Sequence, residues 1–332
     1  MYHKGIRMKR LLSFIASDNY LDQIGDGWIG LNKILQEHQL DGIETMTGGF
    51  YKPENIEIVK PVGHHLLYFP SWLHMWLEDE VELIKEFESL EKAVEVYGGW
   101  GRQRLIDFYR EEFLDSIKMG SEYMVFHVAH VGLDEVFGDN FKYGNKKVLT
   151  YTIDLLNEVF KDMDNGPILL LENLWWPGMD LLDEAETKDF LDQINYSNKG
   201  IMLDISHLTL TDENIDNFEN IEKYIEKVIL NSPTLKKHIR GIHLNATFPL
   251  LYRKNKLKEN KNKIAVIKNR VERYGIIMDH ITNLDSHKIY DDTSINKILK
   301  KLDIEYLVYE FKWKDKKELL ENLKIQNKVL LI

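Results

Sequence analysis

The segment Ile168-Leu-Leu-Leu-Glu172 decides the fold that we expect for this chain. It is a run of large apolar residues, too short to cross a bilayer, that ends on a carboxylate. An uninterrupted apolar run bounded by polar residues is typical of a strand buried on both faces, as in a parallel sheet covered by helices. The same pattern predicts eight strands in all, at Leu11–Ala16, Gly42–Met46, His64–Phe69, Tyr123–Val128, Ile168–Leu174, Gly200–Ile205, Ile239–Leu244 and Tyr306–Phe311.

Segments with helical periodicity separate these strands. Apolar residues recur every three or four positions in Arg104–Met119, Val148–Met163 and Ile215–Leu230. No glycine-rich dinucleotide fingerprint follows the first strand, so the alternation favours a closed (β/α)8 TIM barrel over an open doubly wound sheet. The sequence Gly98-Gly-Trp-Gly101 lacks the Lys-Ser/Thr ending of a phosphate loop, and we interpret it as a helix entry or a loop.

The composition limits the classes of protein to consider. The 332 residues include 43 Lys and Arg against 54 Asp and Glu, a formal net charge of −11, which excludes a generally basic nucleic-acid-binding protein. Hydrophobic residues make up 44% and charged residues 29%, a balance that excludes disorder as the main state. The absence of cysteine excludes disulfide frameworks, thiolate nucleophiles, iron–sulfur clusters and cysteine-type zinc sites. Metal chemistry must therefore use carboxylates and the 12 histidines.

We expect residues 1–332 to form a single domain, because no linker-like or repetitive segment divides the chain. No apolar run is long enough for a membrane span. The short apolar segment after Lys9 and Arg10 is followed at once by Asp18, which argues against a signal peptide. These features predict a soluble, cytoplasmic protein and leave its oligomeric state open.

A long basic insertion, at about residues 248–287, follows the seventh predicted strand. Its cations are Arg253, Lys254, Lys256, Lys258, Lys261, Lys263, Lys268, Arg270 and Arg273. One interpretation is a solvated helix face. The other follows from position, because loops after barrel strands lie at the catalytic face, where clustered cations attract phosphate.

Ionisable residues stand at an end of at least six predicted strands. His127, Glu172, Asp204, His243 and Glu310 lie at carboxyl ends, and His64 or His65 opens or interrupts the third strand. Strand alternation directs Glu172, Asp204 and Glu310 inward, so all these groups should meet at one end of the barrel axis. Any one of them alone is more often a structural residue, but converging unpaired charges repel one another unless cations neutralise them.

Two further pairs extend this set. His207 follows Asp204 by three residues, and Asp285 and His287 lie at i, i+2. Histidine and carboxylate ligands without thiolate suit zinc, manganese or cobalt. The neighbouring pair Asp279-His280 competes with Asp285 and His287 for this position. The sequence therefore predicts a divalent metal centre at the carboxyl ends of the strands.

Four motifs resemble the endonuclease IV and xylose isomerase-like TIM-barrel superfamily over nearly the whole chain. They are Leu171-Glu-Asn-Leu-Trp-Trp-Pro-Gly178, Leu203-Asp-Ile-Ser-His207, Ile242-His-Leu-Asn245 and the closing Glu310. The resemblance implies a metal set of Glu172, Asp204, His243 and Glu310, shared with sugar epimerases and isomerases, with His207 at a further matching position.

The similarity to endonuclease IV implies a larger set. Its additional metal ligands fall at His65, His127, Asp285 and His287, which implies two or three ions, with zinc expected and manganese or cobalt as alternatives. Tyr68, three residues after His65, favours His65 over His64, although both remain open. A full set implies hydrolysis at phosphorus, in which the ions activate a water nucleophile and hold the phosphate oxygens.

The resemblance is incomplete around the expected substrate site. The DNA-gripping loops of endonuclease IV have no match here, and the acidic net charge disfavours duplex DNA. We expect a small phosphorylated or sugar-like substrate, contacted by Tyr68, Trp175, Trp176 and Lys254. The aromatic residues, which also include Trp72, Trp76 and Trp100, are equally compatible with a hydrophobic lid or a subunit contact.

The leading hypothesis is a metal-dependent phosphoester hydrolase in which Glu172, as bridging ligand, and Glu310 are the catalytic carboxylates. The alternative is a single-metal sugar or sugar-phosphate isomerase or epimerase that uses Glu172, Asp204, His243 and Glu310, with the two glutamates as paired bases. A second alternative is a barrel that binds a small ligand without turnover.

Overall fold

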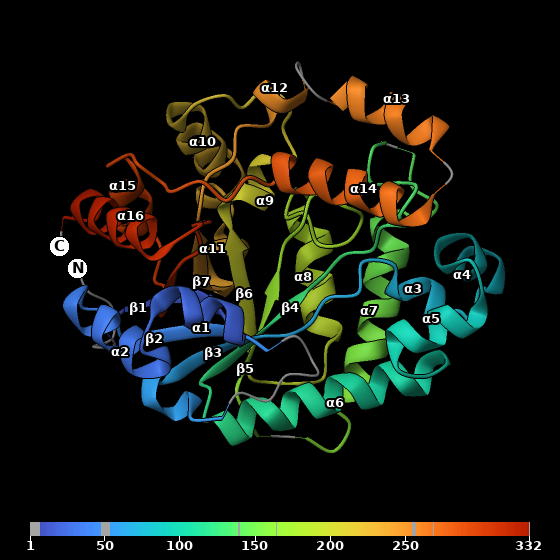
Figure 1. Ribbon diagram of the computed structural model, residues 1–332, viewed down its shortest axis with the longest axis horizontal. Helices are drawn as coiled ribbons and strands as arrows, with labels where there is room; N and C mark the ends of the chain where they lie inside the picture. Colours follow the sequence, from blue (N-terminus) through green and yellow to red (C-terminus); the bar gives the residue numbers. More distant parts are fainter. Residues whose placement is uncertain are drawn as a thin grey trace.

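The computed structural model describes residues 7–47, 54–138, 140–163, 165–253, 257–267 and 269–331. Eight parallel strands close into a barrel in sequence order, because β8 pairs with β1 (Figure 1). The strands are β1 (Lys9–Ile15), β2 (Gly42–Met46), β3 (Pro61–His65), β4 (Tyr123–His127), β5 (Ile168–Glu172), β6 (Lys199–Asp204), β7 (Ile239–Leu244) and β8 (Tyr306–Tyr309). The prediction of a closed (β/α)8 barrel is confirmed.

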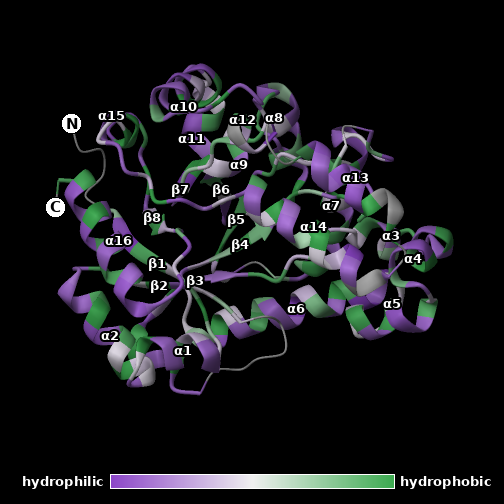
Figure 2. Cartoon of the chain, turned by 45° about the horizontal axis from the view of Figure 1, so that its top comes forward, coloured by the Kyte–Doolittle hydropathy of each residue, from purple (hydrophilic) through white to green (hydrophobic). Residues whose placement is uncertain are grey.

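Helices connect the strands and surround the barrel (Figure 1). Their bounds are α1 (Asp18–Ile24), α2 (Gly27–Glu37), η1 (Ile56–Val59), α3 (Trp72–Trp76), α4 (Glu80–Phe87), α5 (Leu90–Tyr97), α6 (Gly101–Met119), α7 (Asn145–Val159), α8 (Glu184–Gln193), α9 (Ile205–Thr209), α10 (Phe218–Ile225), η2 (Glu226–Leu230), α11 (Pro233–His238), α12 (Pro249–Tyr252), α13 (Lys258–Val266), α14 (Arg270–Leu284), α15 (Ile295–Leu299) and α16 (Lys316–Val329). Figure 2 shows hydrophobic residues alternating with hydrophilic ones along most of these helices, as expected for helices with one face on a core.

Alternation along each strand divides the core into two parts. In β5, Ile168 and Leu170 lie in the cluster that fills the barrel interior, whereas Leu169 and Leu171 pack outward against the helices. Glu172 continues the inward series. The interior apolar layer is made by Leu11, Val62, Tyr123, Val125, Ile168, Leu170, Met202, Tyr306 and Val308. Above this layer the interior becomes polar.

The third strand differs from the prediction. It spans Pro61–His65 rather than His64–Phe69, so His65 ends the strand instead of opening it. Leu66 donates one more hydrogen bond to Val125 of β4, and the chain then leaves the sheet. The apolar residues Leu66 and Phe69 are buried against the surrounding helices, which explains why their pattern imitates a strand.

Several helix boundaries also shift. The segment predicted as one helix at Ile215–Leu230 is α10 followed by the π-helical turn η2. Within Gly98–Gly101, Gly98 ends α5 in the left-handed conformation (φ 71°) and α6 begins at Gly101, as the helix-entry interpretation predicted.

No described helix is both long and apolar enough to cross a membrane.

The basic insertion forms α12, α13 and α14, drawn in orange at the top of Figure 1. Ile277 of α14 packs in a cluster with Phe137 and Trp176. Lys254, Lys256 and Lys268 lie outside the described residues. Other cations have acidic partners, namely Arg253 with Glu213, Lys263 with Glu259 and Arg273 with Asp134. These ion pairs favour the solvated-surface interpretation for the cations that form them.

Candidate metal centre

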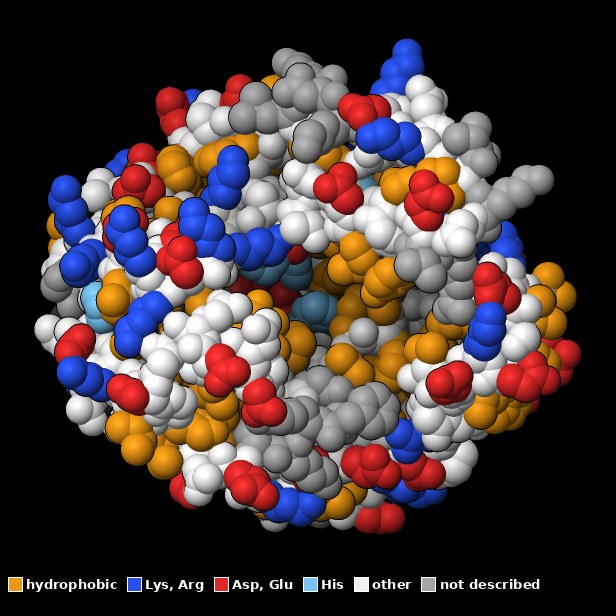
Figure 3. Space-filling view, in the orientation of Figure 1, with side chains coloured by type: hydrophobic (Ala, Val, Ile, Leu, Met, Phe, Trp, Pro, Cys, Tyr) orange, Lys and Arg blue, Asp and Glu red, His pale blue; other side chains and the backbone are white. Residues whose placement is uncertain are grey.

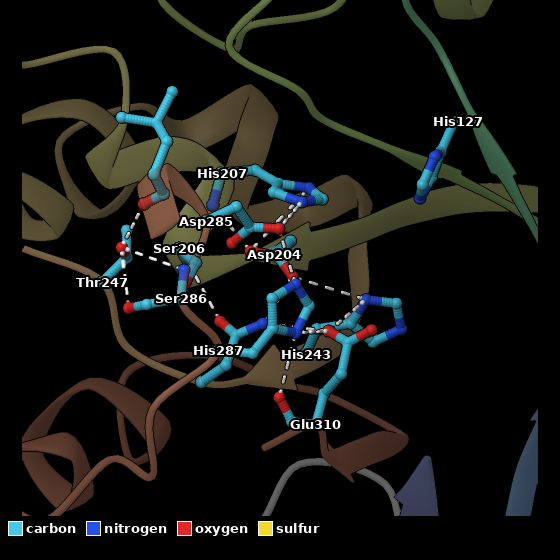
Figure 4. A network of polar contacts seen from close by, with 12 residues as sticks. His127, Asp204, Ser206, His207, His243, Thr247, Asp285, Ser286, His287 and Glu310 are labelled. Carbon is cyan, nitrogen blue, oxygen red and sulfur yellow. Dashed lines mark hydrogen bonds and ion pairs between the residues drawn. The ribbon is translucent and has the colours of Figure 1, made fainter. Parts of the chain in front are cut away.

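The polar strand ends meet at the carboxyl end of the barrel. Strand register places His127 beside Glu172 and Asp204 beside His243 on neighbouring strands. Figure 4 shows His243, His287 and Glu310 close together, with His127 at one side of the group. Among the described residues, four sets of three side chains each bring one ligand atom per residue within 4.8 Å of the others.

Glu172 lies at the centre of the group and is 1% exposed. Its Oε2 lies 3.2 Å from His65 Nε2 and 3.0 Å from His127 Nε2. Its Oε1 lies 3.1 Å from His207 Nδ1 and 3.3 Å from His243 Nδ1. Each carboxylate oxygen thus faces two imidazoles, an arrangement that suits a carboxylate bridging two ions.

A second set surrounds His243. Its Nδ1 lies 3.3 Å from Glu172 Oε1, 3.7 Å from Asp204 Oδ2 and 3.3 Å from Glu310 Oε2. This nitrogen is buried without a hydrogen-bond partner among the described residues. Asn245 holds the set in place, since its Nδ2 donates to Asp204 Oδ2 (2.8 Å) and to Glu310 Oε2 (2.9 Å). An unpaired imidazole nitrogen facing three carboxylates fits a divalent cation.

A third set consists of His207, Asp285 and His287. Asp285 Oδ2 lies 2.6 Å from His287 Nε2 and 3.4 Å from His207 Nε2. His287 has φ 43°, a left-handed conformation that is strained for a residue with a side chain. A hydrogen bond between its Nδ1 and the carbonyl of Glu310 (3.2 Å) supports this orientation. Strain maintained by surrounding contacts is typical of functional positions.

Glu44 belongs to the same group, although the sequence analysis missed it. It lies in the middle of β2, is 1% exposed, and its Oε1 is 2.9 Å from His243 Nε2. Tyr123 donates its hydroxyl to Glu44 Oε2 (2.6 Å). A carboxylate behind a ligating histidine fixes the tautomer and the ring orientation. The signal in the sequence was a charged residue inside a buried strand.

The electrostatics of the centre rest on paired charges. Burial raises the pKa of Glu172, but the imidazoles of His127 and His243 outweigh burial and hold this pKa well below its usual range. Burial lowers the pKa of His243, yet Glu310 and Glu44 raise it well above its usual range. In the absence of metal, imidazolium protons therefore balance the carboxylates. Divalent ions bound at the same atoms would replace these protons.

The pKa values of two groups at the rim of the centre, Glu310 and His287, are raised to or above the neutral range. Burial raises the pKa of Glu310 to about 8, despite the opposing effect of His243 and His287. For His287, burial lowers the pKa but Asp285 and Glu310 raise it to about 9. A carboxyl that holds a proton near pH 7 can act as a general acid, and nearby cations would restore its ligand form.

The structure separates the two histidines that the sequence left open. His65 points into the barrel, whereas His64 points outward, where its Nδ1 bonds with Ser116 Oγ at 2.7 Å. Strand alternation explains this difference. The competing pair Asp279-His280 lies elsewhere, because His280 bonds to Tyr252 and to the carbonyl of Val136.

The residues expected to contact substrate have different surroundings. Tyr68 packs its ring 4.8 Å from that of His127, and Trp175 packs 5.2 Å from His207. Trp176 is 5% exposed and belongs to the core. Lys254 lies outside the described residues. Of the remaining tryptophans, Trp72 and Trp76 are each 2% exposed and pack in the core, whereas Trp100 is 36% exposed.

The centre opens to solvent through a hollow. Figure 3 shows histidine and acidic side chains at its floor, with hydrophobic side chains along one flank and Lys or Arg side chains along the opposite edge. This combination of an apolar flank, a cationic edge and a polar floor is typical of a site that takes a small polar ligand.

The structure thus defines a TIM barrel with a buried group of histidines and carboxylates, a candidate metal centre, at the carboxyl ends of its strands. The model of the xylose isomerase-like TIM-barrel family matches residues 96–324, and the chain belongs to this family. The resemblance inferred from the sequence motifs is thereby confirmed. No curated protein matches the chain.

Solved structures with this fold include enzymes that act on different substrates. An E. coli 3-keto-D-glucoside 4-epimerase is 10% identical, with 98% of this chain and 100% of that chain covered and a TM-score of 0.52. The IOLI protein, solved with a zinc atom, is 13% identical, with coverages of 98% and 97% and a TM-score of 0.50. An endonuclease IV from Thermus thermophilus is 12% identical, with coverages of 97% and 99% and a TM-score of 0.46. At these identities the likeness concerns the fold alone.

Proposed function

We propose that this protein is a metal-dependent hydrolase of a phosphoester with two or three divalent ions. The observation that carries the proposal is the position of Glu172 between four imidazoles, with His65 and His127 on one oxygen and His207 and His243 on the other. A centre with a single ion does not require four imidazoles around Glu172, because four protein ligands already fill the coordination sphere of one ion. A bridging carboxylate needs an ion on each side.

The side chains divide into three ligand groups that share residues. His65, His127 and Glu172 would hold one ion; Glu172, Asp204, His243 and Glu310 a second; and His207, Asp285 and His287 a third. Such ions, zinc or alternatively manganese or cobalt, supply charge neutralisation at the phosphate oxygens and an activated water nucleophile. As a ligand of the second ion Glu310 would be ionised, because bound cations counteract the burial that raises its pKa in the metal-free protein.

The expected substrate is a small phosphorylated molecule. The net charge of −11 disfavours duplex DNA, whose binding depends on neutralising many phosphates. Tyr68 and Trp175 stand beside candidate ligands and offer ring faces to a sugar or base. Lys254 would contribute a cation from the basic insertion, while Trp176, which packs in the core, would support Trp175.

The second candidate is a sugar or sugar-phosphate isomerase or epimerase with one ion. It is favoured by the compact group of Glu172, Asp204 and His243, to which Glu310 adds a further carboxylate 3.3 Å from His243 Nδ1. In that reaction Glu172 and Glu310 would serve as paired bases across the substrate. His65, His127, Asp285 and His287 would then have no catalytic role.

Metal analysis combined with activity assays tests the proposal. Protein purified without chelator should carry at least two equivalents of divalent metal in the barrel and hydrolyse a phosphodiester such as bis-p-nitrophenyl phosphate. One equivalent together with isomerisation of a sugar phosphate would replace the hydrolase with the isomerase. No bound metal and no turnover would leave a ligand-binding barrel.

A further inference from the structure

A cavity of about 360 Å³ lies between the basic insertion and the barrel. Its lining comes from α13 and α14 of the insertion, drawn in orange in Figure 1, and from the segments that follow β4, β5 and β6. Sites for small molecules have volumes of roughly 300–1,000 Å³, so the cavity is large enough for a ligand. None of the candidate metal ligands is among its described lining residues.

Aromatic rings form much of the cavity wall. The rings of Phe137 and His280 have centroids 4.3 Å apart and an interplanar angle of 31°. The rings of Trp175 and Trp176 have centroids 4.3 Å apart and an interplanar angle of 40°. All four residues line the cavity. Because ring faces bind planar groups by stacking, the wall favours a flat, conjugated ligand.

His280 offers the cavity a ring face and not a charge. Its Nε2 donates to the carbonyl of Val136 (2.9 Å), and its Nδ1 accepts the hydroxyl of Tyr252 (2.6 Å). Burial, with a further effect of the cations Arg253 and Lys261, lowers the pKa of His280 to about 4. The ring is therefore neutral at pH 7, and both of its nitrogens are already bonded.

Arg253 offers the cavity an unused hydrogen-bond donor. It lines the cavity, and its Nε is buried without a hydrogen-bond partner among the described residues. Its Nη1 lies 3.4 Å from Glu213 Oε2, so the guanidinium keeps one ion pair. Because buried donors are rarely left unpaired, the free Nε–H indicates an occupant with an acceptor atom.

The charges on the cavity wall balance one another. Among the described lining residues, the cations Arg253 and Lys261 stand against the acids Asp180 and Glu213. Glu213 pairs with Arg253, and Asp180 Oδ1 accepts the backbone N–H of Leu182 at 2.9 Å. A wall without net charge suits the uncharged part of a ligand. A phosphate group would instead lie at the barrel centre, where divalent ions neutralise its oxygens.

Trp175 lies on the border between this cavity and the third ligand set. It lines the cavity, and its ring centroid is 5.2 Å from that of His207. Leu284, another lining residue, directly precedes Asp285 in the chain. The cavity and the candidate metal centre are therefore neighbours. In a nucleotide, one ribose separates the base from the phosphate, which suits two neighbouring sites.

We propose that this cavity binds the base of a nucleotide whose phosphate lies at the barrel centre. The inference rests on the proposed phosphoester hydrolase and narrows its substrates to nucleoside phosphoesters. The aromatic rings stack on the base, and Arg253 donates through Nε to a ring nitrogen or a carbonyl oxygen of the base.

Calorimetric titration of the full-length, metal-loaded protein tests this base site. The two probes are adenosine 5′-monophosphate and ribose 5-phosphate, which carry the same phosphate and differ in the base. We expect adenosine 5′-monophosphate to bind at least about tenfold more tightly. Arg253→Gln and Phe137→Leu should each reduce this ratio of affinities about threefold and leave the affinity for ribose 5-phosphate unchanged.

Two variants outside the cavity are matched controls. Arg110→Gln changes a partly buried arginine of α6 whose Nε donates to the carbonyl of Val159 (3.1 Å). Phe160→Leu changes a phenylalanine that is 7% exposed, as Phe137 is. Neither Arg110 nor Phe160 is among the described residues that line the cavity, so both variants should keep the wild-type ratio.

A further variant separates the base site from the proposed function. Glu172→Gln should weaken the binding of both phosphorylated probes and leave that of adenosine unchanged, because adenosine uses the cavity alone. Adenosine 5′-monophosphate binding no more tightly than ribose 5-phosphate, or a wild-type ratio in both cavity variants with native far-UV spectra, would overturn the base site even in an active hydrolase. A preference for the base in a protein that neither binds metal nor hydrolyses phosphoesters would instead contradict the hydrolase and retain the base site.

Discussion

Replacing His127 with alanine separates a multinuclear hydrolase from a single-metal enzyme. In the structure His127 ends β4 and reaches only the Oε2 side of Glu172, at 3.0 Å, where His65 is the other imidazole. The four side chains of a single-metal site, Glu172 among them, do not include His127. If the protein is a hydrolase with several ions, the variant should therefore lose one of them. If it is a single-metal isomerase, the variant should keep its ion and its activity.

The expected magnitude follows from the ligand count. Without His127, the ion on the Oε2 side keeps one imidazole and a carboxylate shared with a second ion, fewer than the three protein ligands of a typical catalytic zinc. An ion that neutralises phosphate oxygens contributes several kcal/mol to the transition state. At about 1.4 kcal/mol per factor of ten, kcat should fall by roughly 10²- to 10³-fold.

The assay measures metal content and phosphodiester hydrolysis on the same preparation. We expect one equivalent of metal fewer than in the wild type and the corresponding loss of kcat. His238→Ala is the matched control, because it removes a partly buried imidazole just before β7, at the opposite end of the barrel. Unchanged metal content and unchanged kcat in His127→Ala would refute the bridged centre.

Three further predictions concern other parts of the molecule. Glu44→Gln weakens the hold on His243, so the affinity for metal should drop about 10- to 100-fold by competition with a chelator, and an unchanged affinity would remove Glu44 from the centre. Burial raises the pKa of Glu112 to about 7, so the carboxyl keeps its proton in the folded protein at pH values where the unfolded chain releases it. The free energy of unfolding should therefore fall as the pH rises from the ordinary pKa of a glutamate toward 7. Glu112→Gln should remove that fall and be more stable by about 3 kcal/mol at pH 8 but not at pH 4, measured by urea unfolding; equal stability at pH 8 would contradict the raised pKa. Lys254→Gln should raise KM for a phosphorylated substrate several-fold at low salt and little at about 0.5 M salt, whereas an effect independent of salt would argue against a charge contact.

The strands were predictable because burial on both faces leaves a strong apolar signal. Gly42–Met46 and Ile239–Leu244 coincide with β2 and β7. The third strand was placed too late because Leu66 and Phe69 are as apolar as strand residues but are buried beneath helices. An apolar run indicates that residues are buried but does not identify their hydrogen-bond partners. The ends of a strand can therefore not be located from such a run alone.

The candidate ligands at strand ends were predictable for a similar reason. A charged residue at the end of a buried strand, such as Glu172 or Asp204, interrupts the apolar pattern and can therefore be recognised in the sequence. Glu44 is equally charged and buried, but it lies in the middle of a strand that carries no motif. Its partner His243 is 199 residues away, and only closure of the barrel brings them together.

The sequence alone determined the barrel, its inward-facing carboxylates and the histidines that accompany them, because these properties depend on local alternation along each strand. The tertiary structure alone decided that Glu172 faces four imidazoles and that Glu44 supports His243. Such groupings depend on strand register, barrel closure and the path of the connecting loops, which join residues far apart in the chain and leave no periodic trace in the sequence.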